Sequence, residues 1–281
     1  MNQSQSTAQP SGTDSKSQPL LALKGFTKSF GPVAALKDVD FDVSRGEVVA
    51  LVGDNGAGKS TLIKAVSGAQ PPDAGDATWD GHAARLNTPH DATSLGIATV
   101  YQDLALAENL DVVANLFLGQ EEIASTIPGV TVLDETAMEK KAVELLSSLG
   151  VTTLRSVRTE VAMLSGGQRQ AVAIARSLLG DPELVMLDEP TAALGIVQTA
   201  QILKLIQRLR DRGLGVIVIS HNLANVFEVA DRIAVLRLGR LTATFKAEDA
   251  SRQEIVAAIT GADRDPREGL QERTTEEEHP L

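Results

Sequence analysis

The feature that most constrains this chain is a short apolar strand that runs into a glycine-rich loop and then a helix. The predicted strand is Val48–Val52, and the predicted helix runs from Lys59 to Ser67 and ends at Gly68. Between them lies Gly-Asp-Asn-Gly-Ala-Gly-Lys-Ser, residues 53–60. Its glycines let backbone N–H groups converge on phosphate oxygens, and the helix N-terminus adds a partial positive charge. The motif predicts a triphosphate site on an α/β fold, the alternative being a chance glycine-rich turn.

The residues of this loop have separate predicted roles. Lys59 is expected to reach the β and γ phosphates, and the Ser60 hydroxyl to bind Mg²⁺. The predicted cofactors are therefore ATP and Mg²⁺. The predicted binding residues are Gly53, Asp54, Asn55, Gly56, Ala57, Gly58, Lys59, Ser60 and Thr61.

Two acidic residues follow another predicted strand, residues 184–187. Because nucleotides bind at the carboxyl edge of such sheets, Asp188 is placed to hold Mg²⁺ directly or through water. Glu189 points differently and is predicted to accept the proton of the attacking water, an effect of about 100- to 10,000-fold in rate. The alternative is that both residues only begin a turn before Pro190.

His221 and Gln102 also follow predicted strands, at residues 216–220 and 97–101. A neutral His221 imidazole could hydrogen-bond the γ phosphate or the attacking water, so it is included among the catalytic candidates. The amide of Gln102 is predicted to sense both Mg²⁺ and whatever the helical part of the chain contacts. Taken alone, a histidine at a strand end is more often structural, and Gln102 carries no signal.

A second helix start resembles an anion site. Ser165, Gly166 and Gly167 open the predicted helix from Gln168 to Leu179, so a hydroxyl and glycine N–H groups could face a phosphate there. One chain cannot use both sites on one triphosphate if they lie on different lobes. Head-to-tail pairing of two copies would solve this, whereas the alternative is an ordinary serine cap without a ligand.

The whole pattern predicts a mixed α/β sheet. Short β-branched runs alternate with amphipathic helical patterns, which favours a mostly parallel sheet covered by helices. An antiparallel edge lobe is predicted over residues 20–52, with hairpin turns at Asp80-Gly81 and around Gly239. Residues 109–150 look helical, and a last short helix is expected near 255–259. The prediction is one catalytic domain, residues 20–261, with an inserted helical lobe at about 103–180.

Composition excludes several other functions. The net charge of −11 argues against a nucleic-acid surface, and the absence of cysteine excludes a disulfide scaffold. No apolar run approaches the roughly 18 residues of a membrane span, so any role at a membrane would go through a partner. Residues 1–19 are predicted to be a disordered tail, as are the acidic residues 262–281.

Together these motifs resemble the ATP-binding subunit of an ABC transporter, over about residues 20–261. The resemblance gives Gln102 as the glutamine loop, Asp188 as the magnesium ligand, Glu189 as the catalytic glutamate and His221 as the switch histidine. The family's phosphate loop corresponds to residues 53–60 and its signature sequence to residues 164–168. The resemblance implies a P-loop NTPase fold of the ABC type.

Two further features depend on this resemblance. Phe30 stands where the family places an aromatic ring against adenine, the alternative being a core phenylalanine. Residues 53–58 and 189–195 resemble those of bacterial monosaccharide importers of the stand-alone fructose type. The departure is Gly195, where many ABC ATPases carry an aspartate that signals across the dimer.

The resemblance also implies partners and a location. It predicts a homodimer on the cytoplasmic face of the inner membrane, as a peripheral subunit bound to a permease. The segment from Gln102 to Leu118 would form the groove for a cytoplasmic helix of that permease. A periplasmic binding protein would deliver a monosaccharide such as fructose or ribose, and no nucleic acid is involved.

Two alternatives stay open at this stage. An ABC subunit for another solute, or an exporter, shares every catalytic residue. A DNA-repair or mechanical ABC ATPase is disfavoured, because only about sixty residues separate Gln102 from Leu164 and the chain has no cysteine for a zinc module.

Overall fold

The core of the protein is a six-stranded sheet in the order β12-β11-β3-β10-β9-β6. The computed structural model describes residues 18–127 and 130–262, and the two predicted tails fall almost entirely outside these ranges. Five strands of the core sheet are parallel, and β12 adds to its edge antiparallel to β11. The bounds are β3 Val48–Val52, β6 Ile97–Val100, β9 Leu184–Asp188, β10 Gly215–Ile219, β11 Arg232–Arg237 and β12 Arg240–Lys246.

The central strands are apolar throughout because both faces of the sheet are covered, one by helices and the other by a helix together with the antiparallel sheet described below. Every residue of β3 and β10 is buried. The predicted strands at 48–52, 97–101, 184–187 and 216–220 are confirmed to within a residue or so at each end. The carboxyl ends of the parallel strands therefore lie at one edge of the sheet. The candidate residues that follow these strands were predicted to lie at this edge.

A second, antiparallel sheet has the order β2-β1-β4-β5. Its bounds are β1 Leu21–Phe30, β2 Val33–Val43, β4 Ala74–Trp79 and β5 His82–Ala84. Asp80 and Gly81 turn the chain between β4 and β5 with φ of 48° and 73°, the left-handed backbone that tight hairpins need. The predicted antiparallel lobe and its turn are confirmed, but the predicted range of residues 20–52 is too long at its end, because Val48–Val52 belongs to the core sheet.

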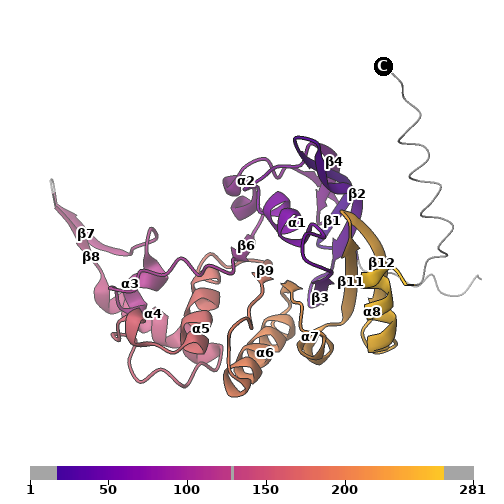
Figure 1. Cartoon of the computed structure of the whole chain (residues 1–281). Coiled ribbons are helices and arrows are strands. Elements are labelled where there is room, and N and C mark those ends of the chain that lie inside the picture. Colours follow the sequence, from indigo (N-terminus) through magenta and orange to yellow (C-terminus); the bar gives the residue numbers. More distant parts are fainter. Residues whose placement is uncertain (1–17, 128–129, 263–281) are drawn as a thin grey trace, which may run out of the picture.

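Three of the helices stand apart from the others (Figure 1). Helices α3, α4 and α5 make a separate lobe at one end of the molecule, while α8 lies beside β11 and β12 at the other. The bounds are α1 Lys59–Val66, α2 Pro89–Ser94, α3 Val112–Phe117, α4 Glu135–Ser148, α5 Gly166–Ser177, α6 Ile196–Asp211, α7 Leu223–Val229 and α8 Arg252–Thr260. None of the helices in the described ranges is both long and apolar enough to cross a membrane.

The helical prediction for residues 109–150 is wrong in its middle. A two-stranded hairpin, β7 Ile123–Ile127 and β8 Val130–Leu133, stands between α3 and α4. These segments are rich in isoleucine, valine and threonine, whose branched side chains lose rotamer freedom in a helix and suit a strand. The lobe is therefore helical with an added hairpin.

Candidate active site

The loop between β3 and α1 has a backbone that requires glycine at two positions. Gly53 and Gly58 have φ of 154° and 107°. A Cβ on Gly53 would lie 2.1 Å from the carbonyl oxygen of Leu236, and one on Gly58 would lie 2.6 Å from that of Ala35. Gly56, with φ of 78°, has open space around it. The loop thus packs closely against neighbouring backbone at Gly53 and Gly58, whereas Gly56 between them has free space.

The different surroundings of Gly53 and Gly56 predict different losses of stability when each is replaced by alanine. Gly56→Ala should cost about 1 kcal/mol of unfolding free energy, because only its left-handed backbone is strained. Gly53→Ala should cost about 3 kcal/mol or more, because backbone must also move. Urea unfolding of the two variants without nucleotide measures the difference. Equal losses would mean that the contact with Leu236 does not constrain the loop.

Lys59 closes the loop on itself. Its ammonium Nζ donates to the carbonyl oxygens of Gly53 at 2.8 Å and Asp54 at 2.9 Å. No side chain caps the N-terminus of α1, and its first turn contains no acidic residue. The N–H groups at this helix start and the Lys59 charge are therefore disposed to bind an anion.

The loop opens onto a cleft of about 510 Å³. The structure brings Gln102, Asp188 and Glu189 to the wall of the same cleft. The predicted residues that line it are Asn55, Gly56, Ala57, Gly58, Lys59, Ser60, Thr61, Gln102, Asp188 and Glu189. Candidates predicted from three separate parts of the sequence thus share one cavity.

Other lining residues were missed by the sequence reasoning. They come from the start of β2 and from the turn between β11 and β12: Val33, Ala34, Ala35, Lys37, Leu238 and Gly239, together with Ile219. The Lys37 N–H donates to the Gly239 carbonyl at 2.8 Å, and the Gly239 N–H donates to the Ala57 carbonyl at 3.0 Å. The turn around Gly239 was predicted, but only tertiary contacts place it over the phosphate loop.

Asp188 ends β9 at the cleft. Burial raises the pKa of its carboxyl group, and the neighbouring charge of Glu189 raises it further, while Lys59 and Lys64 act in the opposite direction. Two adjacent carboxylates in a partly buried position thus repel each other, which is the setting that a bound cation relieves.

Glu189 is held in a strained and incompletely paired state. Its φ is 51°, unusual for a residue other than glycine. Its Oε1 lies 2.9 Å from Nδ1 of His221, and its Oε2 is buried without a hydrogen-bond partner among the described residues. Such an unpaired buried oxygen points to a partner that binds during function.

The donor set fits magnesium. Ser60, Gln102 and Asp188 bring a hydroxyl, an amide oxygen and a carboxylate to one cleft, and Mg²⁺ prefers oxygen ligands. In the part of the chain that the structure describes, no group of three or more His, Cys, Asp or Glu side chains could hold a metal. Phosphate oxygens and water would therefore complete the coordination, as Mg²⁺ usually requires.

The raised pKa of Asp188 makes a pH-dependent prediction. The folded chain binds this proton more tightly than the unfolded chain, so stability is lost as the pH rises from the usual aspartate value of ~3.9 through the raised pKa. Without nucleotide, Asp188→Asn should therefore be more stable than the unmodified chain at pH 7, and the gain should shrink toward pH 4. Urea unfolding across this range measures it. A gain that is absent at pH 7, or that does not depend on pH, would contradict the prediction.

The second helix start lies elsewhere. Ser165 caps α5, its Oγ accepting the Gln168 N–H at 3.3 Å while its own N–H donates to Gln168 Oε1 at 2.9 Å. None of Ser165, Gly166, Gly167 and Gln168 lines the cleft. A single chain therefore shows a serine cap here, and any contact of this helix start with a triphosphate needs a second copy.

Phe30 and His221 stand at the surface, and His221, with 71% of its side chain exposed, does not line the cleft. Phe30 ends β1 with 45% of its surface exposed, so the alternative of a core phenylalanine is wrong. The Lys28 ammonium lies 5.8 Å from its ring centroid, and Phe30 pairs across the hairpin with Val33, which lines the cleft. The ring is next to the cleft without lining it, and its contact with adenine stays a prediction.

The arrangement of the phosphate loop and the acidic residues around the cleft identifies the class of the protein. A phosphate loop at the carboxyl end of a parallel strand, with an acidic pair at the end of a nearby strand, is typical of P-loop nucleotide-binding proteins. The ABC transporter family model matches residues 36–192, and the chain belongs to that family.

Curated relatives match nearly the whole chain. It is 46% identical over 255 residues to the fructose import ATP-binding protein FrcA of Rhizobium meliloti, covering 90% of this chain and 98% of the relative. It is 44% identical to the xylose/arabinose import ATP-binding protein XylG of Sulfolobus acidocaldarius, covering 86% and 94%. The ribose import ATP-binding protein RbsA 1 of Rubrobacter xylanophilus is 42% identical, and the chain spans 47% of its length.

Solved structures of ATP-binding cassettes have the same fold as this chain. A nucleotide-free ATP-binding cassette from an ABC transporter superposes with a TM-score of 0.73 at 25% identity, covering 89% of this chain and 96% of the other. The ATP-binding cassette MJ0796, solved as a dimer in a post-hydrolysis state with ADP and Pi, gives 0.66 at 27% identity, covering 81% and 98%. The predicted fold class and family are confirmed.

Proposed function

We propose that this chain is the ATP-hydrolysing subunit of an ABC importer for a monosaccharide, working as a homodimer beneath a membrane permease. The observation that carries the proposal is the cleft in which Lys59, Asp188 and Glu189 converge. The sugar class is supported by the fructose, xylose/arabinose and ribose import relatives. The import function named for these relatives supports the further proposal of a peripheral position at the cytoplasmic face of the membrane.

The residues of the cleft would have separate roles in the transfer of the γ-phosphoryl group to water. Phosphate oxygens would replace the carbonyls that Lys59 now contacts, and the N–H groups of the loop and of α1 would hold the β and γ phosphates. Glu189 would take the proton of the attacking water on its free Oε2, while His221 fixes the carboxylate through Oε1. Val33 and Leu238 line the cleft as exposed apolar side chains and would lie against the bound nucleotide on that side.

Asp188, Ser60 and Gln102 would hold Mg²⁺ in this scheme. The bound ion would neutralise charge on the β- and γ-phosphate oxygens. Gln102 is the residue of this set that leads directly into the lobe of α3, α4 and α5, which connects the metal site to the partner surface described next.

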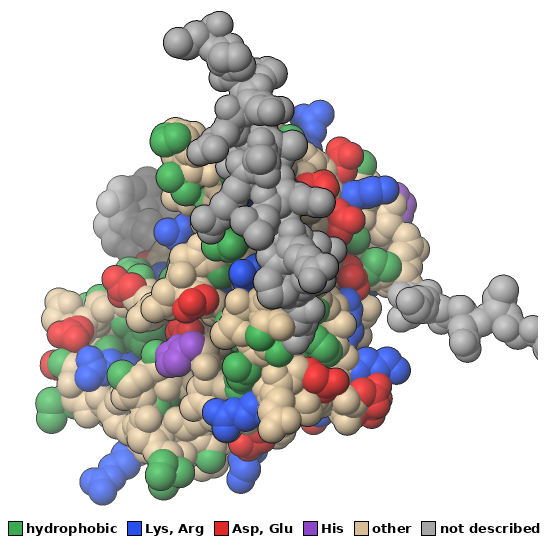
Figure 2. All heavy atoms as spheres, turned by 45° about the vertical axis from the view of Figure 1, so that its right-hand side comes forward, with side chains coloured by type: hydrophobic (Ala, Val, Ile, Leu, Met, Phe, Trp, Pro, Cys, Tyr) green, Lys and Arg blue, Asp and Glu red, His purple; other side chains and the backbone are tan. Residues whose placement is uncertain are grey.

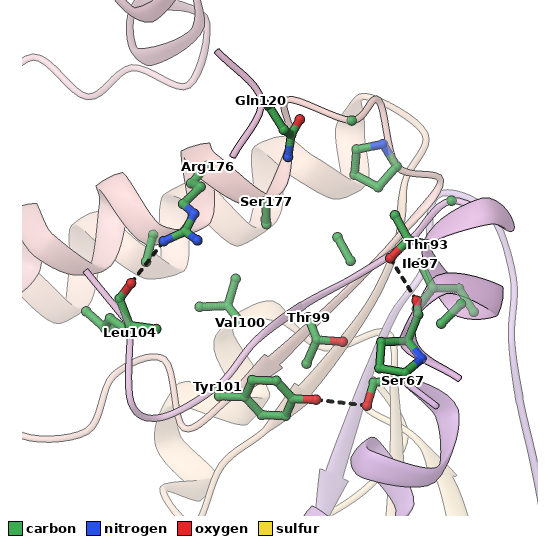
Figure 3. A pocket seen from close by; sticks show the side chains of 18 of the residues that line it. Ser67, Thr93, Ile97, Thr99, Val100, Tyr101, Leu104, Gln120, Arg176 and Ser177 are labelled. Atoms are coloured by element: carbon green, nitrogen blue, oxygen red, sulfur yellow. Dashed lines mark hydrogen bonds between the residues drawn. The ribbon is translucent and has the colours of Figure 1, made fainter. Parts of the chain in front are cut away.

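The permease is proposed to dock in a hollow of about 420 Å³ beside this cleft (Figure 3). The hollow is lined by Tyr101 and by Asp103 to Ala105 on one side, and by Arg176 and Ser177 of α5 on another. Arg176 donates to the Ala105 carbonyl at 2.9 Å, and the Tyr101 hydroxyl pairs with Ser67 at 2.8 Å. The segment after Gln102 thus offers both polar groups and a cavity to an incoming helix.

Nothing on the face shown in Figure 2 favours a nucleic-acid function. Lysine and arginine side chains stand there among acidic ones rather than in a stripe, whereas nucleic-acid-binding proteins usually gather them. The net charge of −11 is likewise unusual for a nucleic-acid-binding protein.

The test is reconstitution of the full chain with its permease in lipid vesicles. We expect a binding protein loaded with a monosaccharide to stimulate ATP turnover, and the same protein without sugar to stimulate it less. A parallel assay with amino-acid-loaded binding proteins serves as the control. Turnover stimulated only by the amino-acid-loaded proteins, or export of sugar from the vesicles, would overturn the sugar-import proposal.

A further inference from the structure

A hydrogen bond in the hollow of Figure 3 joins two segments that reach the active-site cleft separately. The Tyr101 hydroxyl lies 2.8 Å from Ser67 Oγ, which is 34 residues away in the sequence. Tyr101 follows β6 and immediately precedes Gln102, whereas Ser67 follows the last residue of α1. Both side chains line the hollow, and Ser67 is buried. The far end of the phosphate-binding helix is thus bonded to the segment that carries Gln102.

The hydroxyl proton of Ser67 is already used in another bond. Ser67 Oγ donates to the Lys64 carbonyl oxygen at 3.1 Å, in the last turn of α1. A serine hydroxyl has a single proton and accepts through its lone pairs. The Tyr101 O–H is therefore the donor, and Ser67 Oγ is its acceptor. Tyr101 needs Ser67 for this bond, whereas Ser67 keeps its bond to Lys64 without Tyr101.

Gln102 lies beyond the regular part of the core sheet. The strand before it, β6, is an edge strand, and its pairing with β9 ends at Val100 opposite Leu187. Gln102 comes two residues later, as an exposed side chain at the wall of the cleft. Because strand pairing does not reach Gln102, the bond of Tyr101 to α1 is placed to fix the start of this segment.

The helix to which Tyr101 is bonded also carries a predicted Mg²⁺ ligand. Ser60 lies in the first turn of α1 and Ser67 follows its last residue, about 10 Å apart at the rise of an α-helix. A helix of two turns moves as one piece, so a bond to Ser67 fixes the Gln102 segment relative to Ser60. Ser60 and Gln102 line the same cleft, and both would hold Mg²⁺ in the function proposed above.

We propose that Tyr101 is a positioning residue, whose hydrogen bond to Ser67 places Gln102 to bind the Mg²⁺ that accompanies ATP. The proposal rests on the Mg²⁺ site proposed above. Tyr101 does not line the cleft, so it acts through the backbone that it shares with Gln102. Loss of the bond should weaken the contribution of Mg²⁺ to nucleotide binding. Binding of metal-free ATP should not change, because the phosphate loop and Lys59 are untouched.

The test measures ATP affinity by titration calorimetry, once with Mg²⁺ and once with EDTA. The full-length chain carries Glu189→Gln to prevent turnover, and the ratio of the two affinities is the gain that Mg²⁺ provides. Tyr101→Phe keeps the ring and removes only the hydroxyl. We expect it to lower the gain about 2- to 10-fold, the range for one hydrogen bond, with the affinity in EDTA unchanged. An unchanged gain would overturn the positioning role.

Variants of Ser67 test the hydrogen bond itself. Ser67→Ala removes the acceptor and should lower the gain as Tyr101→Phe does, whereas Ser67→Thr keeps a hydroxyl and should preserve the gain. The double variant with Tyr101→Phe and Ser67→Ala should lose no more than either change alone. Additive losses would mean that the two side chains act independently, which would contradict the proposal.

Two controls separate the role of Tyr101 from the Mg²⁺ site on which it rests. Thr93→Val removes another hydroxyl from the same hollow, one that donates to the Pro89 carbonyl within α2, and should leave the gain unchanged. An equal loss in Thr93→Val would count against Tyr101. If Gln102→Ala lowers the gain and Tyr101→Phe does not, the Mg²⁺ site stands and the role of Tyr101 is wrong. If Gln102→Ala has no effect, Gln102 does not hold Mg²⁺ and both proposals fail.

Discussion

Replacing Glu189 with glutamine should leave ATP binding intact while lowering hydrolysis about 100- to 10,000-fold. The phosphate loop and Lys59 are untouched by the change, so the grip on the triphosphate stays. The amide is a far weaker proton acceptor than the carboxylate, and its Oε1 position can still pair with His221, which lies 2.9 Å away. Single-turnover hydrolysis and equilibrium binding of ATP, measured on the same preparation, separate the two effects.

The matched control for this variant is Lys59→Ala. That change should weaken ATP binding itself, because it removes the ammonium that now bridges the carbonyls of Gly53 and Asp54. Near-normal turnover by Glu189→Gln would remove Glu189 from the base role. Its strained φ of 51° and its unpaired oxygen would then need another explanation.

Mixing two inactive variants should restore activity if the sites are shared between copies. Lys59→Ala damages the phosphate loop, and Ser165→Arg damages the helix start that would cover the second copy's triphosphate. In a mixed pair, one site is made of the damaged phosphate loop and the damaged helix start. The other site is made of the intact phosphate loop and the intact helix start. With random pairing, about one quarter of the normal number of sites should be intact. Steady-state ATP turnover of the mixture, against each variant alone, measures this.

A second mixture controls for the first. Lys59 and Glu189 line the cleft of the same chain, so a mixture of Lys59→Ala with Glu189→Gln contains no site with an intact cleft half. It should regain nothing. Recovery in both mixtures, or in neither, would argue against head-to-tail sharing of the triphosphate.

Local sequence was sufficient to predict those segments whose conformation depends mainly on their own residues. The strand Val48–Val52 and the loop after it are recognisable because a buried strand must be apolar and a phosphate loop must contain glycine. The turn at Asp80 and Gly81 is recognisable for the same reason, since a tight hairpin needs a left-handed backbone. The hairpin of β7 and β8 was missed because it interrupts a stretch whose flanks are helical.

Residue type and local pattern were therefore enough to locate the candidate groups of the site: the phosphate loop, the acidic pair after β9 and the residues that end the other parallel strands. Packing between distant segments is what brings Lys37, Leu238 and Gly239 over that loop. The same packing pairs Glu189 with His221 and leaves the Ser165 helix start outside the lining of its own chain's cleft. The reason is physical. A residue's type and neighbours fix what it can bind, whereas its partners across the fold depend on how sheets and helices pack, which no local pattern encodes.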